Sequence, residues 1–262
     1  MKAVWKNRFK NSNLLMQIKN KMPPYKIFYF KSLTSTQDKA KEFARKGLSN
    51  IVVISDIQIK GRGRFKRKWY SGKGGLWMSI LLKPKNVKNL QYLTFAAAIS
   101  VVKSIKKIAN LKTNIKWPND VHYKKKKLCG ILTEGIFGKD NYVVVGIGLN
   151  VNQSKFPNEI KNIASSLKII KKKTFNIKKL TKTIIDEFGI LYDNYYKKNN
   201  LKQILKIWKS YCDTLNKNIT VITRTKKING EAVGIDKDCN LLLKLKNGKI
   251  IKIIEGDINV RY

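Results

Sequence analysis

The alternation of apolar and polar positions changes once along the chain, near residue 216. Before that point, apolar runs of strand length alternate with amphipathic stretches of helical period. The runs predict strands over residues 25–31, 51–54, 76–82, 112–117, 128–136 and 142–151. Four polar residues, 138–141, separate the last two runs and predict a hairpin. This pattern is typical of an α/β domain in which helices flank a sheet.

Three stretches carry the apolar stripe of a helix that packs on a sheet: Leu90–Ala109, Leu180–Tyr196 and Leu201–Tyr211. A shorter helix is predicted near residue 36. Its start has the capping-box spacing of Ser35 and Asp38, and it ends at Gly47. The hydroxyl groups at this helix start either cap the helix and do nothing more, or also bind a polar ligand.

After residue 216 the pattern shortens to alternating strands, as in Leu241 to Lys246. Asn229-Gly230 and Asn247-Gly248 carry the signature of type I′ hairpin turns. We therefore predict three segments: a basic arm over 1–24, helical or disordered, a catalytic domain over 25–214, and a small β-barrel over 215–262.

One loop, Gln58 to Trp69, is dense in glycine and arginine and lies between two predicted strands. Glycines allow the backbone to approach a ligand, and arginines offer forked donors that suit carboxylates and phosphates. The loop therefore predicts a site for a small anionic ligand. A solvated nucleic-acid-binding loop and a hairpin tip without a role remain the alternatives.

Composition narrows the function classes. The net charge is +40, from 56 basic and 16 acidic residues, but the lysines are spread along the whole chain and do not by themselves indicate a nucleic-acid function. Three cysteines far apart disfavour a disulfide framework and fit a reducing, cytoplasmic location. The chain has one histidine, His122, which we expect in a loop, so a histidine-based metal site or catalytic triad is disfavoured. No apolar run is long enough to span a membrane. The acid-poor residues 1–24 also resemble an organelle transit peptide, but serine and arginine are few there, which disfavours this alternative.

Three further motifs follow the loop in order. They are Lys116-Trp117-Pro118-Asn119-Asp120, Lys127-Leu128-Cys129-Gly130-Ile131-Leu132 and Gly146-Ile147-Gly148-Leu149-Asn150. Together with Gly61-Arg62-Gly63-Arg64 and Trp69, and with Gly256-Asp257 near the end, they resemble the biotin–protein ligase family from about residue 25 onward.

The resemblance implies a mixed, largely antiparallel sheet flanked by helices, like the catalytic domain of class II aminoacyl-tRNA synthetases, followed by an SH3-like β-barrel. It also implies an ATP-dependent ligase that forms biotinyl-5′-AMP and transfers biotin to one lysine of a biotin carboxyl carrier domain. Biotin, ATP and that carrier are the implied partners, and Mg²⁺ is expected to arrive with ATP rather than through a metal motif of the chain.

By the same resemblance, the catalytic groups would be Arg62, Arg64, Lys116 and Lys127. The biotin-binding residues would be Ser35, Thr36, Gln37, Gln58, Gly61, Arg62, Gly63, Arg64, Lys127 and Gly130. The adenylate-binding residues would be Arg67, Trp69, Lys116, Asn119, Gly148 and Asn150. Without their motifs, Lys116 and Lys127 read as solvated charges and Trp69 as a core residue. Asp120 is expected to order its loop rather than to bind Mg²⁺.

Two departures from the family pattern stand out. Phe65-Lys66 replaces a common Arg-Gly pair, at little expected cost, and Gln37 replaces a commoner asparagine. No DNA-binding domain is expected ahead of residue 25, so we expect neither a repressor role nor specific DNA binding. An exposed sheet could pair two subunits as a homodimer. Lipoate–protein ligase and a non-enzymatic nucleic-acid-binding protein remain the competing functions.

Overall fold

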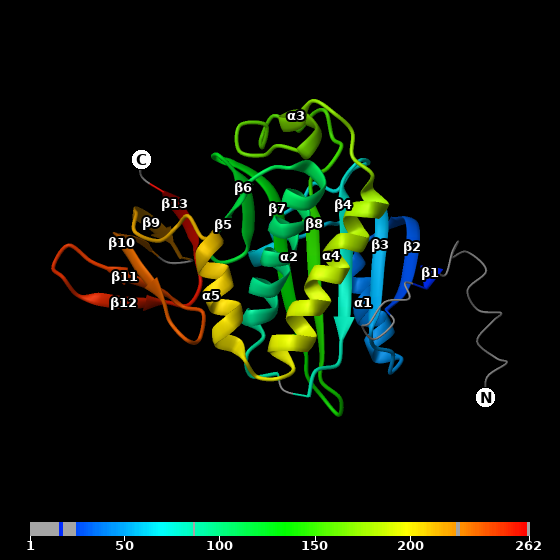
Figure 1. The fold of residues 1–262 in the computed structure, drawn as a ribbon, viewed down its shortest axis with the longest axis horizontal. Coiled ribbons are helices and arrows are strands. Elements are labelled where there is room, and N and C mark those ends of the chain that lie inside the picture. Colours follow the sequence, from blue (N-terminus) through cyan, green and yellow to red (C-terminus); the bar gives the residue numbers. More distant parts are fainter. Residues whose placement is uncertain (1–15, 18–24, 86, 224–225, 261–262) are drawn as a thin grey trace.

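The computed structural model describes residues 16–17, 25–85, 87–223 and 226–260. An eight-stranded sheet organises the larger part of the molecule, in the order β1-β2-β3-β4-β8-β7-β6-β5 (Figure 1). Its strands are β1 Met16–Gln17, β2 Lys26–Leu33, β3 Ile51–Gln58, β4 Leu76–Leu82, β5 Asn114–Lys116, β6 Asp120–Tyr123, β7 Lys126–Ile136 and β8 Tyr142–Leu149.

Only the β2–β3 pair of this sheet is parallel, and every other neighbouring pair is antiparallel. The predicted mixed, largely antiparallel sheet is therefore confirmed. The central strands are apolar on both faces because helices cover both, and every residue of β4 is buried. The predicted hairpin at residues 138–141 joins β7 to β8.

Helices cover the two faces unequally (Figure 1). One face carries α1, Thr36–Arg45, whose Phe43 packs in a cluster with Ile51, Val53 and Val144. The other face carries the remaining long helices, which are α2 Gln91–Ala109, α4 Ile177–Leu191 and α5 Leu201–Tyr211. A π-helical turn, Tyr192–Tyr196, extends α4, and a short helix α3, Leu167–Lys171, lies at one end of the sheet.

Ser35 and Gly47 cap α1 as predicted, whereas Asp38, the other residue of the predicted capping box, pairs with Arg62 instead. Ser35 accepts a hydrogen bond from the backbone N–H of Gln37 and so caps the helix start. Gly47 follows the helix end with a φ of +74°, a conformation that glycine adopts without strain. Thr36 and Gln37, in the first turn of α1, are thereby fixed at the edge of the sheet where β3 ends.

The C-terminal residues form a separate antiparallel sheet in the order β12-β11-β10-β9-β13, as the predicted small barrel requires. Its strands are β9 Asn218–Ile222, β10 Lys227–Ile235, β11 Leu241–Lys244, β12 Ile250–Ile253 and β13 Asp257–Val260. Two side-chain hydrogen bonds join it to the larger domain. The indole Nε1 of Trp117 donates to Cys239 O, and the phenol Oη of Tyr92 donates to Lys237 O.

The predicted hairpin turn at Asn229-Gly230 is wrong, because both residues lie inside β10. A Cβ at Gly230 would lie 2.5 Å from Lys244 O and 2.8 Å from Leu243 Cγ. The glycine therefore permits a close approach between β10 and β11 instead of forming a turn. Asn247-Gly248 does connect β11 to β12, but only Gly248 has a positive φ, so this turn is not of type I′.

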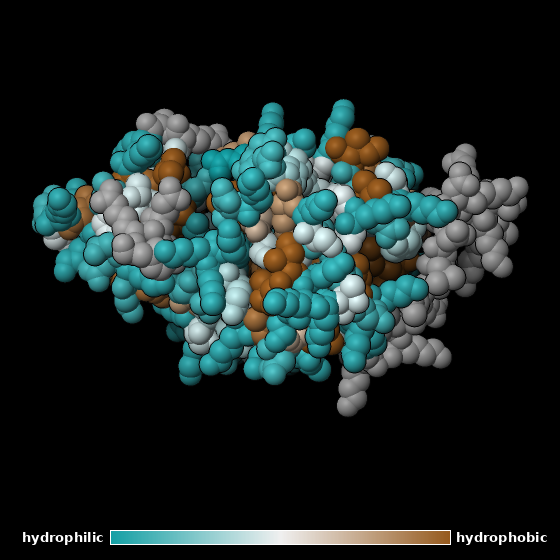
Figure 2. Space-filling model, turned by 90° about the horizontal axis from the view of Figure 1, so that it is seen from above, coloured by the Kyte–Doolittle hydropathy of each residue, from teal (hydrophilic) through white to brown (hydrophobic). Residues whose placement is uncertain are grey.

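The predicted N-terminal arm, residues 1–24, lies outside the described residues except for Met16 and Gln17, which pair with β2. None of the described helices is long and apolar enough to cross a membrane. The face seen in Figure 2 is mostly hydrophilic, with hydrophobic patches between the polar side chains. This surface agrees with the even spread of lysines along the sequence.

Candidate functional site

The glycine- and arginine-dense segment forms a loop between β3 and β4. Its base is closed by a hydrogen bond from Gln58 N to Ser71 O, and its neck by one from Trp69 N to Gly61 O. A Cβ at Gly61 would lie 2.4 Å from Ser71 Oγ, so no larger residue fits there without displacement. The loop spanning residues 61–69 is called the arginine loop below.

A chain of polar side chains lies beneath the arginine loop. The Ser79 hydroxyl donates to Thr36 Oγ1 (2.8 Å), which donates to Gln58 Oε1 (3.0 Å). Gln58 Nε2 donates in turn to Ser71 Oγ at 2.9 Å. These groups come from β4, α1 and β3, so burial and mutual hydrogen bonding hold them in fixed orientations.

Gln37 stands beside this chain. Its Nε2 atom donates to Leu132 O at 3.2 Å and to Glu134 Oε2 at 2.8 Å. Its Oε1 atom is buried and has no hydrogen-bond partner among the described residues. A buried acceptor without a partner is costly, so this oxygen is suited to receive an N–H group from a ligand.

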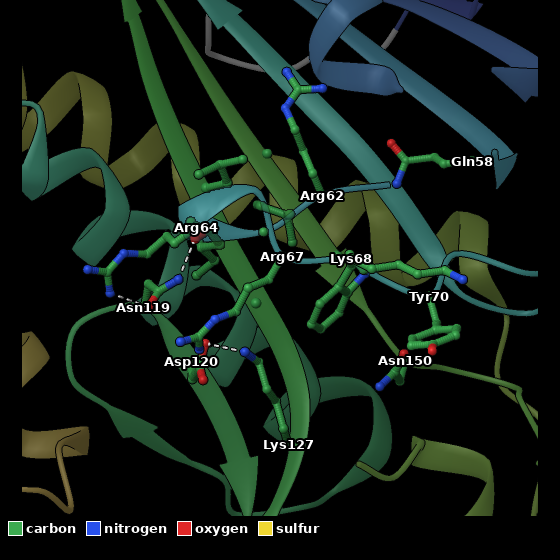
Figure 3. A pocket seen from close by; sticks show the side chains of 18 of the residues that line it. Gln58, Arg62, Arg64, Arg67, Lys68, Tyr70, Asn119, Asp120, Lys127 and Asn150 are labelled. Carbon is green, nitrogen blue, oxygen red and sulfur yellow. Dashed lines mark hydrogen bonds and ion pairs between the residues drawn. The ribbon is translucent and has the colours of Figure 1, made fainter. Parts of the chain in front are cut away.

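Three cationic side chains lie below the arginine loop in Figure 3. Arg64 Nη1 donates to Asn119 Oδ1 at 3.3 Å and to Gly256 O at 3.4 Å, while Arg67 is ion-paired with Asp257. Burial lowers the pKa of Arg64. The C-terminal sheet therefore supplies acceptors for two arginines of the loop.

The third cation is Lys127, at the start of β7. Its Nζ atom lies 2.7 Å from Asp120 Oδ1 and 5.2 Å from the centre of the Trp69 ring. The indole of Trp69 rests on two glycines that are paired across strands, Gly130 of β7 and Gly148 of β8. A Cβ at Gly148 would lie 2.4 Å from Trp69 Nε1. The glycines thus make room for the aromatic ring.

The segment between β8 and α3 supplies the opposite wall, with Phe156, Ile160 and Ile163. It is held to β7 by two backbone hydrogen bonds, from Lys127 N to Ile163 O and from Ser165 N to Lys127 O. Asn150, at the end of β8, accepts a hydrogen bond from Gln153 in the same segment.

These groups surround one cavity of about 320 Å³. Apolar side chains of the central strands also line it: Met78, Ile131, Leu132 and Ile147. A cavity that is partly apolar and bears a few converging polar groups is the usual form of a small-molecule site. With five basic side chains in its lining, it suits a ligand with an apolar body and an anionic end.

Comparison with known proteins identifies the family. Residues 27–152 match the biotin/lipoate A/B protein ligase family, and residues 214–261 match the biotin protein ligase C-terminal domain. The chain is 35% identical, over 260 residues, to the bifunctional ligase/repressor BirA of Bacillus subtilis (strain 168), with 97% of this chain and 79% of that relative covered. The chain belongs to the biotin protein ligase family.

Solved structures agree. The biotin protein ligase of Aquifex aeolicus in complex with biotin and ATP is 33% identical, with a TM-score of 0.76 over 90% of this chain and 98% of that one. The apo structure of the same ligase gives a TM-score of 0.77 at 29% identity, over 90% and 99% of the two chains. These comparisons support a biotin protein ligase over the two competing functions, a lipoate–protein ligase and a non-enzymatic nucleic-acid-binding protein.

The structure brings together most of the side chains that the sequence predicted for a biotin protein ligase site. The cavity is lined by Ser35, Thr36, Gln37, Gln58, Arg62, Gly63, Arg64, Arg67, Trp69, Asn119, Lys127, Gly130, Gly148 and Asn150. Gly61 stands outside the lining and closes the loop neck instead. Lys116 lies at the end of the edge strand β5, opposite Asp120, and does not line the cavity.

Sequence reasoning missed several functional neighbours. Asp38, Glu134 and Asp257 each pair with an arginine of the loop. The sequence indicated Asp38 only as a capping residue and Asp257 only as part of a family motif, and it gave no signal for Glu134. Ser71 and Ser79 complete the buried polar chain. Ser79 lies within a predicted buried strand, so its polarity was an available signal, whereas Ser71 lies in the loop before that strand and gave none.

Two smaller expectations are wrong. His122 lies in β6, not in a loop, and its Nε2 atom is 2.9 Å from Asp213 Oδ1. The Phe65-Lys66 replacement is not free of strain, because both residues have a positive φ, 54° and 58°. A glycine at position 66 would adopt this conformation without the cost of about 1–2 kcal/mol that other residues bear there.

Proposed function

We propose that this chain condenses biotin with ATP in the cavity and then biotinylates a lysine of a biotin carboxyl carrier domain. In the first step a biotin carboxylate oxygen attacks the α-phosphorus of ATP. The bond between the α-phosphorus and the oxygen that bridges to the β-phosphate breaks, and pyrophosphate leaves. In the second step the lysine nitrogen attacks the acyl carbon, the bond to AMP breaks, and the amine gives up its proton to water. The observation that carries the proposal is the cavity itself, apolar inside and cationic at the rim.

The inner part of the cavity suits the biotin ring system. The orphan acceptor Gln37 Oε1 fits a ureido N–H group, and the fixed groups of Ser35, Thr36 and Gln58 lie beside it. The apolar side chains of the central strands fit the thioether ring and the aliphatic tail. This assignment also gives the unusual residue Gln37 a role.

The rim suits the reacting anions. A carboxylate is already ionised at neutral pH, so the first step needs no general base. It needs cations that reduce repulsion between carboxylate and phosphate and hold them in line. Arg64, Arg67 and Lys127 supply these charges, and Trp69 and Asn150 flank the region that we assign to the adenine. Lys116 does not line the cavity and would have to act on an α-phosphate that extends toward β5.

A metal ion would enter with the nucleotide. Asp120 and Asp257 line the cavity, but each is ion-paired with a cation of the site. Within the described residues, no group of three or more histidine, cysteine or acidic side chains could hold a metal. Mg²⁺ is usually bound through phosphates and one or two carboxylates, so we propose that ATP carries it and that it neutralises phosphate charge. Three free cysteines support a reducing compartment, and we propose a cytoplasmic location.

Calorimetric titration of biotin into the purified protein tests the proposal, first without and then with ATP and Mg²⁺. We expect saturable biotin binding, and pyrophosphate release when ATP is added. Lipoate in place of biotin should give neither signal. Absence of biotin binding would contradict the proposal.

The second step has its own test. A purified biotin carboxyl carrier domain should gain the mass of one biotin group, and a variant with arginine at the acceptor lysine should gain none. EDTA should abolish the gain, and excess Mg²⁺ should restore it. Full activity in EDTA would contradict the role of the metal.

A further inference from the structure

The guanidinium group of Arg62 points in a different direction from those of the other arginines of the loop. Figure 3 shows its guanidinium on the side of the loop away from Arg64 and Arg67. Its two terminal nitrogens form a fork on one carboxylate: Nη1 is 2.9 Å from Asp38 Oδ2, and Nη2 is 2.7 Å from Asp38 Oδ1. Bidentate pairing of this kind fixes direction as well as distance.

A second carboxylate joins the contact. Glu134 Oε2 lies 3.4 Å from Arg62 Nη2 and 2.8 Å from Gln37 Nε2, while Glu134 Oε1 lies 2.8 Å from Lys41 Nζ. Asp38 and Lys41 belong to α1, and Glu134 belongs to β7. The arginine loop is thus tied by one side chain to two rigid elements on the same side of the cavity.

The charges of this cluster balance, since two carboxylates face two cations. The hydrogen bonds that Arg62 donates to Asp38 are the main reason that the pKa of Arg62 is raised. By contrast, Arg64 donates its hydrogen bonds only to neutral acceptors and feels nearby carboxylates only at longer range, and Arg67 pairs with a half-exposed carboxylate on the C-terminal sheet. An incoming phosphate or carboxylate therefore competes least with the protein's own carboxylates at Arg64 and most at Arg62.

We propose that Arg62 is a positioning residue, through which Asp38 and Glu134 latch the arginine loop over the cavity. Arg64 and Arg67 bind the anionic ligand, and Arg62 keeps its fork on Asp38 while they do so. The sequence resemblance placed Arg62 among the catalytic and biotin-binding groups. The latch assigns it a different task, which is to slow the opening of the loop and so retain the activated intermediate.

The latch is tested first without any ligand. The loop contains five trypsin sites, which are Arg62, Arg64, Lys66, Arg67 and Lys68. Asp38→Asn should speed cleavage within the loop about fivefold. Trypsin cuts the open loop, and the fraction of molecules with an open loop rises when the closed loop is less stable. Glu42→Gln is the matched control, since Glu42 lies on the same helix and pairs with Lys39 and Lys46, away from the loop. Equal cleavage of Asp38→Asn and wild-type protein would overturn the proposal.

The second test measures the intermediate and rests on the proposed function. Asp38→Asn, Arg62→Met and the double variant should each release biotinyl-adenylate about tenfold faster than wild type, a factor within reach of one charge-assisted bidentate contact. The double variant should be no faster than either single variant, because all three break the same contact. In Asp38→Asn, the rate of adenylate formation at saturating biotin and ATP should change by less than about twofold.

A direct contact of Arg62 with the reacting anions gives another pattern. Arg62→Met would then lower the rate of adenylate formation while Asp38→Asn left it unchanged, and that result would overturn the proposal. Arg62→Lys, which keeps the charge and loses the fork, should retain the fast release if the fork is what matters. A wild-type protein that formed no adenylate would defeat the proposed function, whereas the trypsin test would still decide the latch.

Discussion

Lys127 Nζ lies 2.7 Å from Asp120 Oδ1, so the lysine at the start of β7 is held over the cavity by the first residue of β6. The same ammonium lies 5.2 Å from the centre of the Trp69 ring. A carboxylate on one side and an aromatic face on the other fix the charge where the acyl and phosphate groups would meet.

Replacing this charge should slow the first chemical step. We expect Lys127→Met to lower the rate of pyrophosphate release about a hundredfold, since removal of one preorganised contact to the developing charge usually lowers a rate by about that factor. Lys126→Met is the control, because the neighbouring ammonium donates to Asn162 O and does not line the main cavity. Similar rates for the two variants would show that Lys127 is an ordinary surface lysine.

The paired glycines beneath Trp69 predict a steric effect. A Cβ at position 148 would lie 2.4 Å from Trp69 Nε1, so Gly148→Ala must displace the indole. We expect the KM for ATP to rise at least tenfold, because overpacking of this kind shifts side chains at a cost of about 1–3 kcal/mol. Gly72→Ala should leave KM unchanged, since a Cβ there meets nothing within 4 Å.

Arg64 should retain the intermediate directly. Its guanidinium donates to Asn119 Oδ1 and Gly256 O across the cavity rim. We expect Arg64→Ala to release biotinyl-adenylate about tenfold faster into solution, by loss of a charge-assisted contact. The exposed Arg45→Ala, at the far end of α1, serves as the arginine control. Unchanged release together with normal ligation would contradict this role.

The core contact between α2 and α5 predicts a stability effect. Trp208 is fully buried and stacks on Phe95 with ring centres 4.1 Å apart. Trp208→Ala should lower the free energy of unfolding by about 3–5 kcal/mol, which a urea titration measures. Ile190→Ala, on the outer face of α4, should change it by about 0.5 kcal/mol or less, because that side chain is 43% exposed. Equal losses would mean that α5 does not pack as described.

Two tyrosines with raised pKa values predict the alkaline limit of stability. Burial, with a hydrogen bond to Asp56, raises the pKa of Tyr29 to about 12, and burial raises that of Tyr196 to about 12. Unfolded tyrosine has a pKa of about 10, so between pH 10 and 12 the native state binds more protons than the unfolded state. Stability should therefore be full below pH 10 and fall as the pH rises to 12. Urea midpoints across this range measure the fall, and a flat profile would refute it. Tyr29→Phe should make the fall in stability with pH less steep.

Local pattern sufficed for most elements of the fold. The α2 stripe, the caps of α1 and the β7–β8 hairpin each depend on residues close in the sequence, and they form as predicted. Asn229-Gly230 shows the limit of such reasoning. The dipeptide has the composition of a turn, but pairing with β9 and β11 places it inside a strand, and contact with Leu243 explains the glycine.

The sequence by itself determined the family, the central strands and helices, and most of the side chains that line the cavity, because these follow from short motifs and from periodicity. The tertiary structure decided which charges meet. Arg62 finds Asp38, 24 residues earlier, and Arg67 finds Asp257 on the last strand of the C-terminal sheet. Such pairs depend on how helices, loops and sheets pack against one another. For Asp257 they also depend on register, because a one-residue shift of β13 would turn its side chain to the other face. The placement of Lys116 outside the cavity was decided in the same way, since it sits on the edge strand β5.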